Sequence, residues 1–123
     1  MFTSSIGWIL IVTGIITAGG GLVALLFPNL FLRLGFGDGT PANSAVLFVR
    51  HWGVLISVVA ALIIYSAQAP AIRGPVLIAA IVEKFAIGLL VFFGPVKRTA
   101  VMTAIAIGDG SIAVLYVAYL VGR

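Results

Sequence analysis

Four apolar segments, each long enough to cross a lipid bilayer, make up most of this chain. They lie at about 6–27, 44–67, 73–95 and 99–121, and each is close to the ~20 residues that a helix needs to span a ~30 Å hydrocarbon core. In lipid only helices and closed barrels satisfy the backbone polar groups, and uninterrupted runs of this length indicate helices. The sequence therefore predicts an all-α fold: an integral membrane four-helix transmembrane bundle, with residues 1–123 forming a single domain.

The composition agrees with this prediction and excludes several classes of protein. Hydrophobic residues make up 63% of the chain and charged residues 8%, whereas about a quarter of a soluble domain is charged. The net charge is +4, but the cations are mostly scattered singly, so there is no clustered patch for nucleic acid. Membrane lipid is the expected partner of the exposed cations. The chain has no cysteine, which excludes disulfides and thiolate metal sites.

The connections between segments are short except for 28–43. This stretch mixes Leu and Phe with Arg33 and Asp38, which predicts an interfacial loop that lies on the headgroups. Its closely spaced glycines are interpreted as a turn, because no strand precedes them and the Lys-Ser/Thr of a phosphate-binding loop is missing. The prolines fall near segment ends, so no segment is expected to be broken at mid-span.

Small residues form stripes in the first and last segments. Gly7, Gly14 and Gly21 recur every seven residues, and the last segment carries Ala100, Ala104 and Gly108. Such stripes let helix backbones approach closely in a membrane. Packing within the bundle and assembly into a homo-oligomer both fit this pattern.

Five ionisable residues lie inside the apolar segments, where a charge is costly and normally marks function. They are Arg50, His51, Glu83, Lys84 and Asp109. Counted from the face that carries the third connection, Glu83, Lys84 and Asp109 come at about 15–18 Å and Arg50 at about 9 Å, given a rise of 1.5 Å per residue. The two carboxylates balance the lysine and the arginine, as the cost of unpaired charge in lipid requires.

The pairing of these charges has more than one solution. Glu83 and Lys84 are neighbours that point about 100° apart, so each is expected to find its partner on another helix. Equal depth favours Lys84 with Asp109, which leaves Glu83 for Arg50 or His51. A pairing of Arg50 with Asp109 also fits, because both side chains lean toward the same face. Arg50 can instead reach the interface and act as an anchor.

Two hydroxyls extend the predicted cluster along the bundle. Tyr116 lies two turns beyond Asp109 on the same helix face, and Ser57 stands in the same relation to Arg50. The predicted ligand or proton pathway therefore consists of Arg50, His51, Ser57, Glu83, Lys84, Asp109 and Tyr116.

His51 is the only histidine of the chain, and its expected role is a hydrogen bond, a proton relay or catalysis. A metal site is not expected, because one imidazole and two carboxylates that need other partners make a poor ligand set.

Three functions follow from these residues. The leading interpretation is a small membrane protein whose buried charged pocket binds a lipophilic small molecule or handles protons. The second is an intramembrane enzyme of isomerase or cyclase type, with Glu83, Asp109 and His51 as acid–base groups acting on a lipid-soluble substrate without a cofactor. The third is a non-catalytic accessory or assembly subunit of a membrane complex, which would use the small-residue stripes as its contact surface.

The arrangement of the polar residues resembles that of small bacterial membrane proteins of the DoxX-like kind. Arg50-His51-Trp52-Gly53 begins the second segment, Glu83-Lys84 lies in the third, and Asp109-Gly110 lies in the fourth. The similarity covers the whole chain and is one of layout. Some DoxX-like proteins are associated with quinone-linked oxidoreductases, so the resemblance implies a bacterial inner-membrane protein with an accessory role, and it assigns no functional residue.

The orientation in the membrane depends on very few cations. One face carries the amino terminus, Arg73 and Arg123, and the other carries Arg33, Lys97 and Arg98. The positive-inside rule does not decide between such even counts. The adjacent pair Lys97-Arg98 favours its own face as the cytoplasmic one, with both termini outside.

Overall fold

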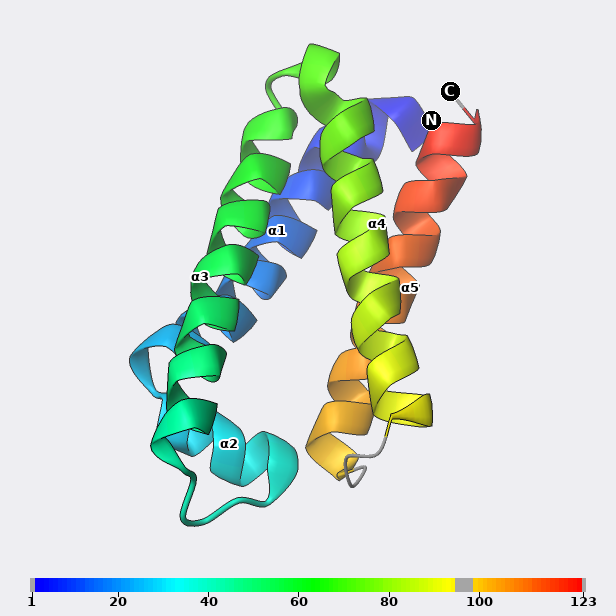
Figure 1. Ribbon diagram of the computed structural model, residues 1–123. Coiled ribbons are helices and arrows are strands. Elements are labelled where there is room, and N and C mark those ends of the chain that lie inside the picture. Colours follow the sequence, from blue (N-terminus) through cyan, green and yellow to red (C-terminus); the bar gives the residue numbers. More distant parts are fainter. Residues whose placement is uncertain (1, 95–98, 123) are drawn as a thin grey trace.

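The computed structural model describes residues 2–94 and 99–122, with side chains from residue 5 onward, and it is helical almost throughout (Figure 1). The helices are α1 (Phe2–Leu26), α2 (Pro28–Phe36), α3 (Asn43–Ser66), α4 (Pro70–Phe93) and α5 (Ala100–Gly122). Four of them, all but α2, are long and apolar enough to cross a membrane. The chain is therefore an all-α integral membrane protein, a four-helix bundle, as predicted.

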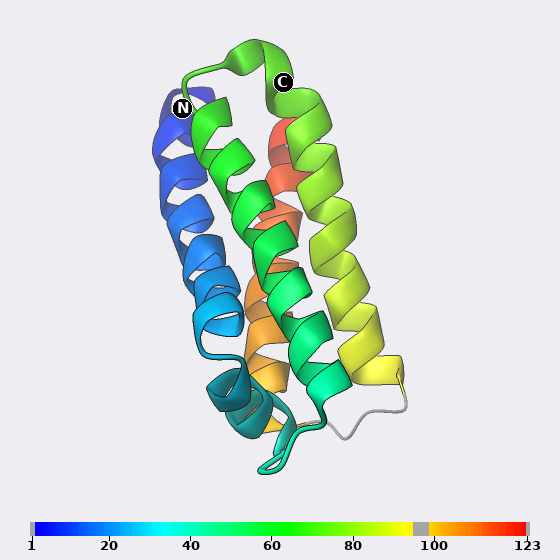
Figure 2. The same cartoon turned by 60° about the vertical axis from the view of Figure 1, so that its left-hand side comes forward.

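The four long helices alternate in direction and form two close pairs. α1 packs along α3, and α4 packs along α5; α3 then contacts α4, while α5 touches α1 only lightly. Figure 2 shows α1 beside α3 over their whole length, and Figure 1 shows both termini at one end of the bundle. α1 and α4 are diagonal to each other, and their backbones do not approach closely.

Glycines explain why α1 and α3 approach so closely. A Cβ atom at Gly53 would lie 2.6 Å from the carbonyl oxygen of Gly21 and 2.7 Å from the backbone nitrogen of Leu25. A Cβ atom at Gly21 would lie 3.0 Å from the backbone nitrogen of Ser57, and one at Gly14 would meet Ile64. Two of the three striped glycines thus pack inside the bundle, whereas Gly7 has no atom within 4 Å of its Cβ position.

Residues 28–36 of the predicted interfacial loop form the short helix α2, which lies across the end of the bundle opposite the termini (Figure 1). Pro28 occupies the first turn, where its missing N–H costs nothing. Gly37 ends the helix in the left-handed conformation, with φ of 70°, and donates its N–H to the carbonyl of Arg33 at 3.0 Å. A residue with a side chain would be strained at this position.

Thr99 joins α2 to the start of α5. Its hydroxyl donates to the carbonyl of Gly35 and accepts the N–H of Met102 at 3.1 Å, which caps the first turn of α5. Met102 also packs against Gly35. These contacts fix α2 beneath the gap between α1 and α5.

The start of α4 differs from the expectation that every proline lies at a segment end. The helix begins at Pro70, three residues before the predicted start, so Pro75 falls inside it. Arg73 steadies the turn before this helix, because its guanidinium donates to the carbonyls of Ser66 and Ala67, both at 2.7 Å. These carbonyls belong to the end of α3, where they lack helical partners.

The core consists of two apolar clusters at different levels of the bundle. The larger one lies toward the termini and includes Leu10, Ile63, Leu77 and Tyr116. The smaller one lies toward α2 and is formed by Val91, Met102 and Ala106 with neighbouring aromatic rings. Lys97, Arg98 and Arg123, on which the expected orientation depends, lie outside the described residues.

Candidate functional site

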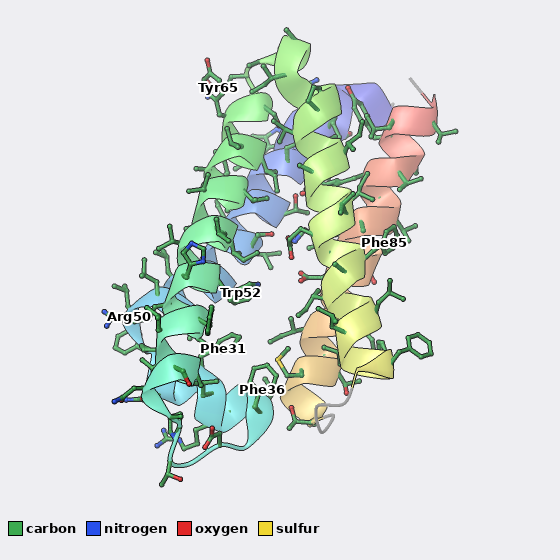
Figure 3. All side chains as sticks on the ribbon, viewed as in Figure 1. Phe31, Phe36, Arg50, Trp52, Tyr65 and Phe85 are labelled. Atoms are coloured by element: carbon green, nitrogen blue, oxygen red, sulfur yellow. The ribbon has the colours of Figure 1, made fainter. Side chains whose placement is uncertain are left out.

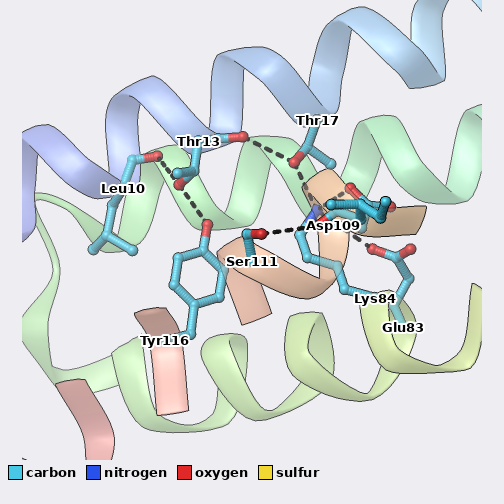
Figure 4. A network of polar contacts seen from close by, with 9 residues as sticks. Leu10, Thr13, Thr17, Glu83, Lys84, Asp109, Ser111 and Tyr116 are labelled. Carbon is cyan, nitrogen blue, oxygen red and sulfur yellow. Dashed lines mark hydrogen bonds and ion pairs between the residues drawn. The ribbon is translucent and has the colours of Figure 1, made fainter. Parts of the chain in front are cut away.

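Lys84 crosses the interior of the bundle between the two core clusters. It is fully buried, which is rare for a lysine unless it is paired. Its stem starts on α4 and its ammonium reaches Thr17 on the diagonal helix α1, as Figure 4 shows. This side chain therefore makes a polar link between two helices whose backbones do not approach closely.

The ammonium of Lys84 has three polar neighbours. Its Nζ atom donates to Oγ1 of Thr17 at 2.9 Å and to Oδ1 of Asp109 at 3.3 Å, and it forms an ion pair with Oε1 of Glu83 at 3.9 Å. Lys84 and Thr17 each lie nine residues before the end of their helix, and Asp109 lies nine residues after the start of its own. At 1.5 Å per residue these three groups share one level, about 14 Å from the helix ends near α2.

Thr17 also fixes the direction of the bonds around it. Its hydroxyl donates to the carbonyl of Thr13 at 2.8 Å, so its oxygen is left to accept from Lys84. Thr13 donates in the same way to the carbonyl of Ile9 at 2.6 Å, and its hydroxyl also shares a 2.5 Å hydrogen bond with the hydroxyl of Tyr116. The polar residues form two separate branches on α1, each ending on a backbone carbonyl.

The two carboxylates face a cavity. Glu83 and Asp109 line a space of 310 Å³ whose other walls are Thr17 and mostly apolar residues of α1, α2, α3 and α5. Their side chains are about 20% exposed (19% and 20%), whereas Lys84 behind them is fully buried. Oε1 of Glu83 is buried and, within the described part of the chain, has no hydrogen-bond partner. The cavity thus ends in a negatively charged polar wall.

The cavity opens sideways between α1 and α5. Its walls there are Ile16 and Gly20 on α1 and Ala104 and Gly108 on α5, all of which are exposed. Neither Gly20 nor Gly108 has an atom within 4 Å of its Cβ position. In a membrane this opening faces lipid.

Phe31 on α2 forms the floor of the cavity and connects it to two smaller spaces. One, of 250 Å³, lies between α1, α2 and α5, and the other, of 180 Å³, lies between α2, α3, α4 and α5. Phe31 lines all three, and its ring lies 5.3 Å from that of Trp52. Figure 3 shows Trp52 pointing from α3 toward the inside of the bundle above Phe31.

The structure brings three of the seven predicted pathway residues into one cluster and buries a fourth nearby. Glu83, Lys84 and Asp109 form the cluster, with Lys84 paired to Asp109 as equal depth predicts. Tyr116 is buried, and its hydroxyl forms a hydrogen bond with that of Thr13. The expectation that Glu83 and Lys84 do not pair is wrong, because the long lysine stem curves back and brings its ammonium within 3.9 Å of the neighbouring carboxylate.

The other three predicted residues lie outside the cluster. Arg50 is exposed and points away from the interior of the bundle (Figure 3); it donates Nε to the carbonyl of Leu25 at 3.3 Å, where it caps the end of α1. Neither pairing proposed for Arg50, with Asp109 or with Glu83, occurs. His51 is also exposed, and Ser57 packs against Gly21 with its buried hydroxyl unpartnered in the described structure.

Thr13 and Thr17 were not among the residues predicted from the sequence to form the site. Both are buried on α1, the one spanning helix without a charge. A signal was present, because two threonines spaced by four residues share one helix face, and Thr17 lies at the depth of the charged level. Among the described residues, no group of three or more His, Asp or Glu side chains is arranged to hold a metal ion.

Comparison of this chain with known protein families, with curated proteins and with solved structures finds no match.

Proposed function

We propose that this small membrane protein binds a lipophilic small molecule in the cavity between α1 and α5. The observation that carries the proposal is the pair of carboxylates, Glu83 and Asp109, on one wall of a largely apolar cavity of 310 Å³, together with the buried Oε1 of Glu83 that accepts no hydrogen bond from the described residues. Buried polar groups are normally satisfied, and each exception calls for an explanation. A cavity of this size with few polar groups fits a small-molecule site, which is typically about 300–1,000 Å³.

The way the cavity opens supports a ligand that comes from the bilayer. Its mouth is formed by exposed apolar and glycine residues of α1 and α5, at the level where lipid chains surround the bundle. A water-soluble ligand would have to cross lipid to reach it. The layout shared with DoxX-like proteins adds the bacterial inner membrane to the proposal as the location.

Ligand binding has stronger support than proton transfer along the bundle. A proton path needs hydroxyls that pass hydrogen bonds to one another, but Thr13 and Thr17 both donate to backbone carbonyls of their own helix. Tyr116 and Lys84 therefore belong to branches that are not joined through hydroxyl groups. The polar residues are arranged to hold Lys84 and its two carboxylates in place.

Trp52 supplies the experiment that tests the proposal. It lines the cavity and is one of only two tryptophans, so Trp8→Phe leaves it as the single indole. We expect brominated alkyl probes to quench this fluorescence saturably in nanodiscs of phosphatidylcholine, and the unbrominated compounds to displace them. Trp52→Phe leaves the exposed Trp8 as a reporter of simple partitioning into lipid.

Gly20→Leu provides a variant that blocks the cavity mouth. A side chain at Gly20 meets nothing within 4 Å, so the protein should fold normally while the leucine fills the opening. Gly7→Leu is the matched control, because Gly7 lies on the same helix, is equally open and does not line the cavity. Saturable quenching that survives Gly20→Leu, or that never occurs with any probe, would refute the proposal.

A further inference from the structure

The charge of the cavity wall identifies the class of ligand. Glu83 and Asp109 are the two carboxylates of the cluster and Lys84 is its one cation, so the ionised cluster carries a net charge of −1. The arginine that the sequence analysis placed there as the second cation is at the end of α1 instead. When both carboxylates are ionised, one negative charge at mid-membrane depth has no balancing cation in the cluster.

The position of Lys84 directs this charge toward the cavity. The ammonium is fully buried behind the carboxylates and does not line the cavity, whereas both carboxylates do. A ligand in the cavity therefore meets the carboxylates first. Since an unbalanced charge in low dielectric costs several kcal/mol, a bound cation would remove much of this cost.

Hydrogen bonding leads to the same ligand chemistry. Oε1 of Glu83 accepts no hydrogen bond, and it is too far from Nζ of Lys84, at 3.9 Å, to accept one from that group. A protonated amine provides the missing positive charge, and its N–H groups are donors for the carboxylate oxygens that line the cavity. The remaining walls of the cavity, such as Ile16, Ile56 and Ile112, suit a hydrocarbon body.

We infer that the ligand of this cavity is a lipophilic monocation, an amphiphilic amine whose ammonium binds between Glu83 and Asp109 and whose apolar part lies against α1, α3 and α5. This inference rests on the proposed function and makes it more specific. The cation enters from the bilayer between α1 and α5, and its hydrocarbon part passes along Gly20, Ala104 and Gly108. A ligand with a neutral hydroxyl head leaves the charge of the wall unbalanced.

The test compares a brominated alkylammonium with the brominated alcohol of equal chain length, by quenching of Trp52 in the Trp8→Phe protein. Nanodiscs of zwitterionic phosphatidylcholine remove any attraction of the amine to anionic headgroups. We expect the ammonium to bind at least about tenfold more tightly than the alcohol, which corresponds to about 1.4 kcal/mol. Equal affinities would overturn the inference but leave the proposed function standing, whereas absence of saturable binding by both probes would overturn both.

Glu83→Gln is the decisive variant. It removes one negative charge, so that the cluster becomes neutral, and it breaks no hydrogen bond of the described structure. We expect the tenfold preference for the ammonium to fall to about twofold or less. Asp38→Asn is the matched control, because Asp38 is the third and last acidic residue of the chain and lies on an exposed turn. A preference that is unchanged in Glu83→Gln and also in Asp109→Asn would show that these carboxylates do not select the ligand.

Discussion

Nζ of Lys84 on α4 lies 2.9 Å from Oγ1 of Thr17 on α1, and this hydrogen bond spans the diagonal of the bundle. The bond gives Thr17 an importance that its residue type alone would not indicate. Without it, the ammonium keeps only the two carboxylates on one side.

Thr17→Val should therefore destabilise the protein although it preserves the shape of the side chain. A hydrogen bond to a charged group contributes about 1.5–3 kcal/mol, and we expect a loss of that size in the free energy of unfolding. Reversible denaturation in mixed micelles measures it. Thr103→Val is the control, because its hydroxyl donates to the Thr99 carbonyl one turn earlier and should be worth no more than about 0.5 kcal/mol.

Lys84→Met should be the most destabilising neutral substitution in the cluster. It leaves two carboxylates without their counterion, and removal of one partner of a buried pair costs about 3–5 kcal/mol. Adding Asp109→Asn should recover part of the loss, with a coupling of at least about 1 kcal/mol in a double-mutant cycle. Strictly additive free energies of unfolding would mean that the 3.3 Å contact between Lys84 and Asp109 contributes nothing.

Alanine at three glycines should give three different results. At Gly53 the new Cβ meets backbone atoms at 2.6 and 2.7 Å, so α1 and α3 must separate. At Gly21 the closest backbone atom is at 3.0 Å and at Gly7 nothing lies within 4 Å. We expect losses of about 3 kcal/mol or more at Gly53 and about 1–2 kcal/mol at Gly21.

Gly7→Ala should instead be neutral or stabilising by up to about 1 kcal/mol, since alanine is the better helix former. Melting temperatures of the three variants in one detergent provide the measurement. An equal effect at Gly7 and Gly53 would contradict the packing of α1 on α3.

Arg50→Gln and His51→Gln should leave binding of the cavity ligand unchanged within about twofold, because both side chains are exposed and neither lines the cavity. Arg50→Gln should still lower stability by about 1 kcal/mol through loss of the bond to Leu25. Quenching of Trp52 by the brominated ammonium measures the affinity. A tenfold loss of affinity in either variant would show that Arg50 or His51 contributes to ligand binding.

The membrane spans and the depth of each charge could be predicted from the sequence. Hydropathy identifies four spans because each must cross the same hydrocarbon thickness. A constant rise per residue then places Lys84 and Asp109 at one level, and the structure pairs them at 3.3 Å. The depth of a residue along a helix follows from its position in the sequence, so these predictions do not depend on how the helices pack.

The rotation of each helix could not be predicted in the same way. In a soluble protein the apolar face of a helix points inward, but lipid is as apolar as the core, so this signal is absent. His51 lies on the stripe of α3 with Val54, Leu55 and Val58, and all four are exposed. Arg50 is on the side of α3 that faces α1, where α1 has just ended, so its guanidinium finds a free carbonyl there.

The short helix α2 was predictable in part. Pro28 at its first turn and Gly37 just past its end are the residues expected at these two positions. Its nine residues are too few to stand out beside four long spans. The contact of Gly35 with Thr99 positions α2 under the cavity. It joins residues 64 positions apart, so no local sequence pattern predicts it.

The 3.9 Å ion pair of Glu83 and Lys84 has a consequence for the biosynthesis of the protein. When helices enter the bilayer in the order of the chain, α4 does so before α5, which carries Asp109. A lone lysine or carboxylate at the centre of a helix raises the insertion cost by about 2.5–3.5 kcal/mol. Because Glu83 and Lys84 neutralise each other within one helix, α4 enters the bilayer without net charge in its middle. Asp109 then arrives at an ammonium that is already in place.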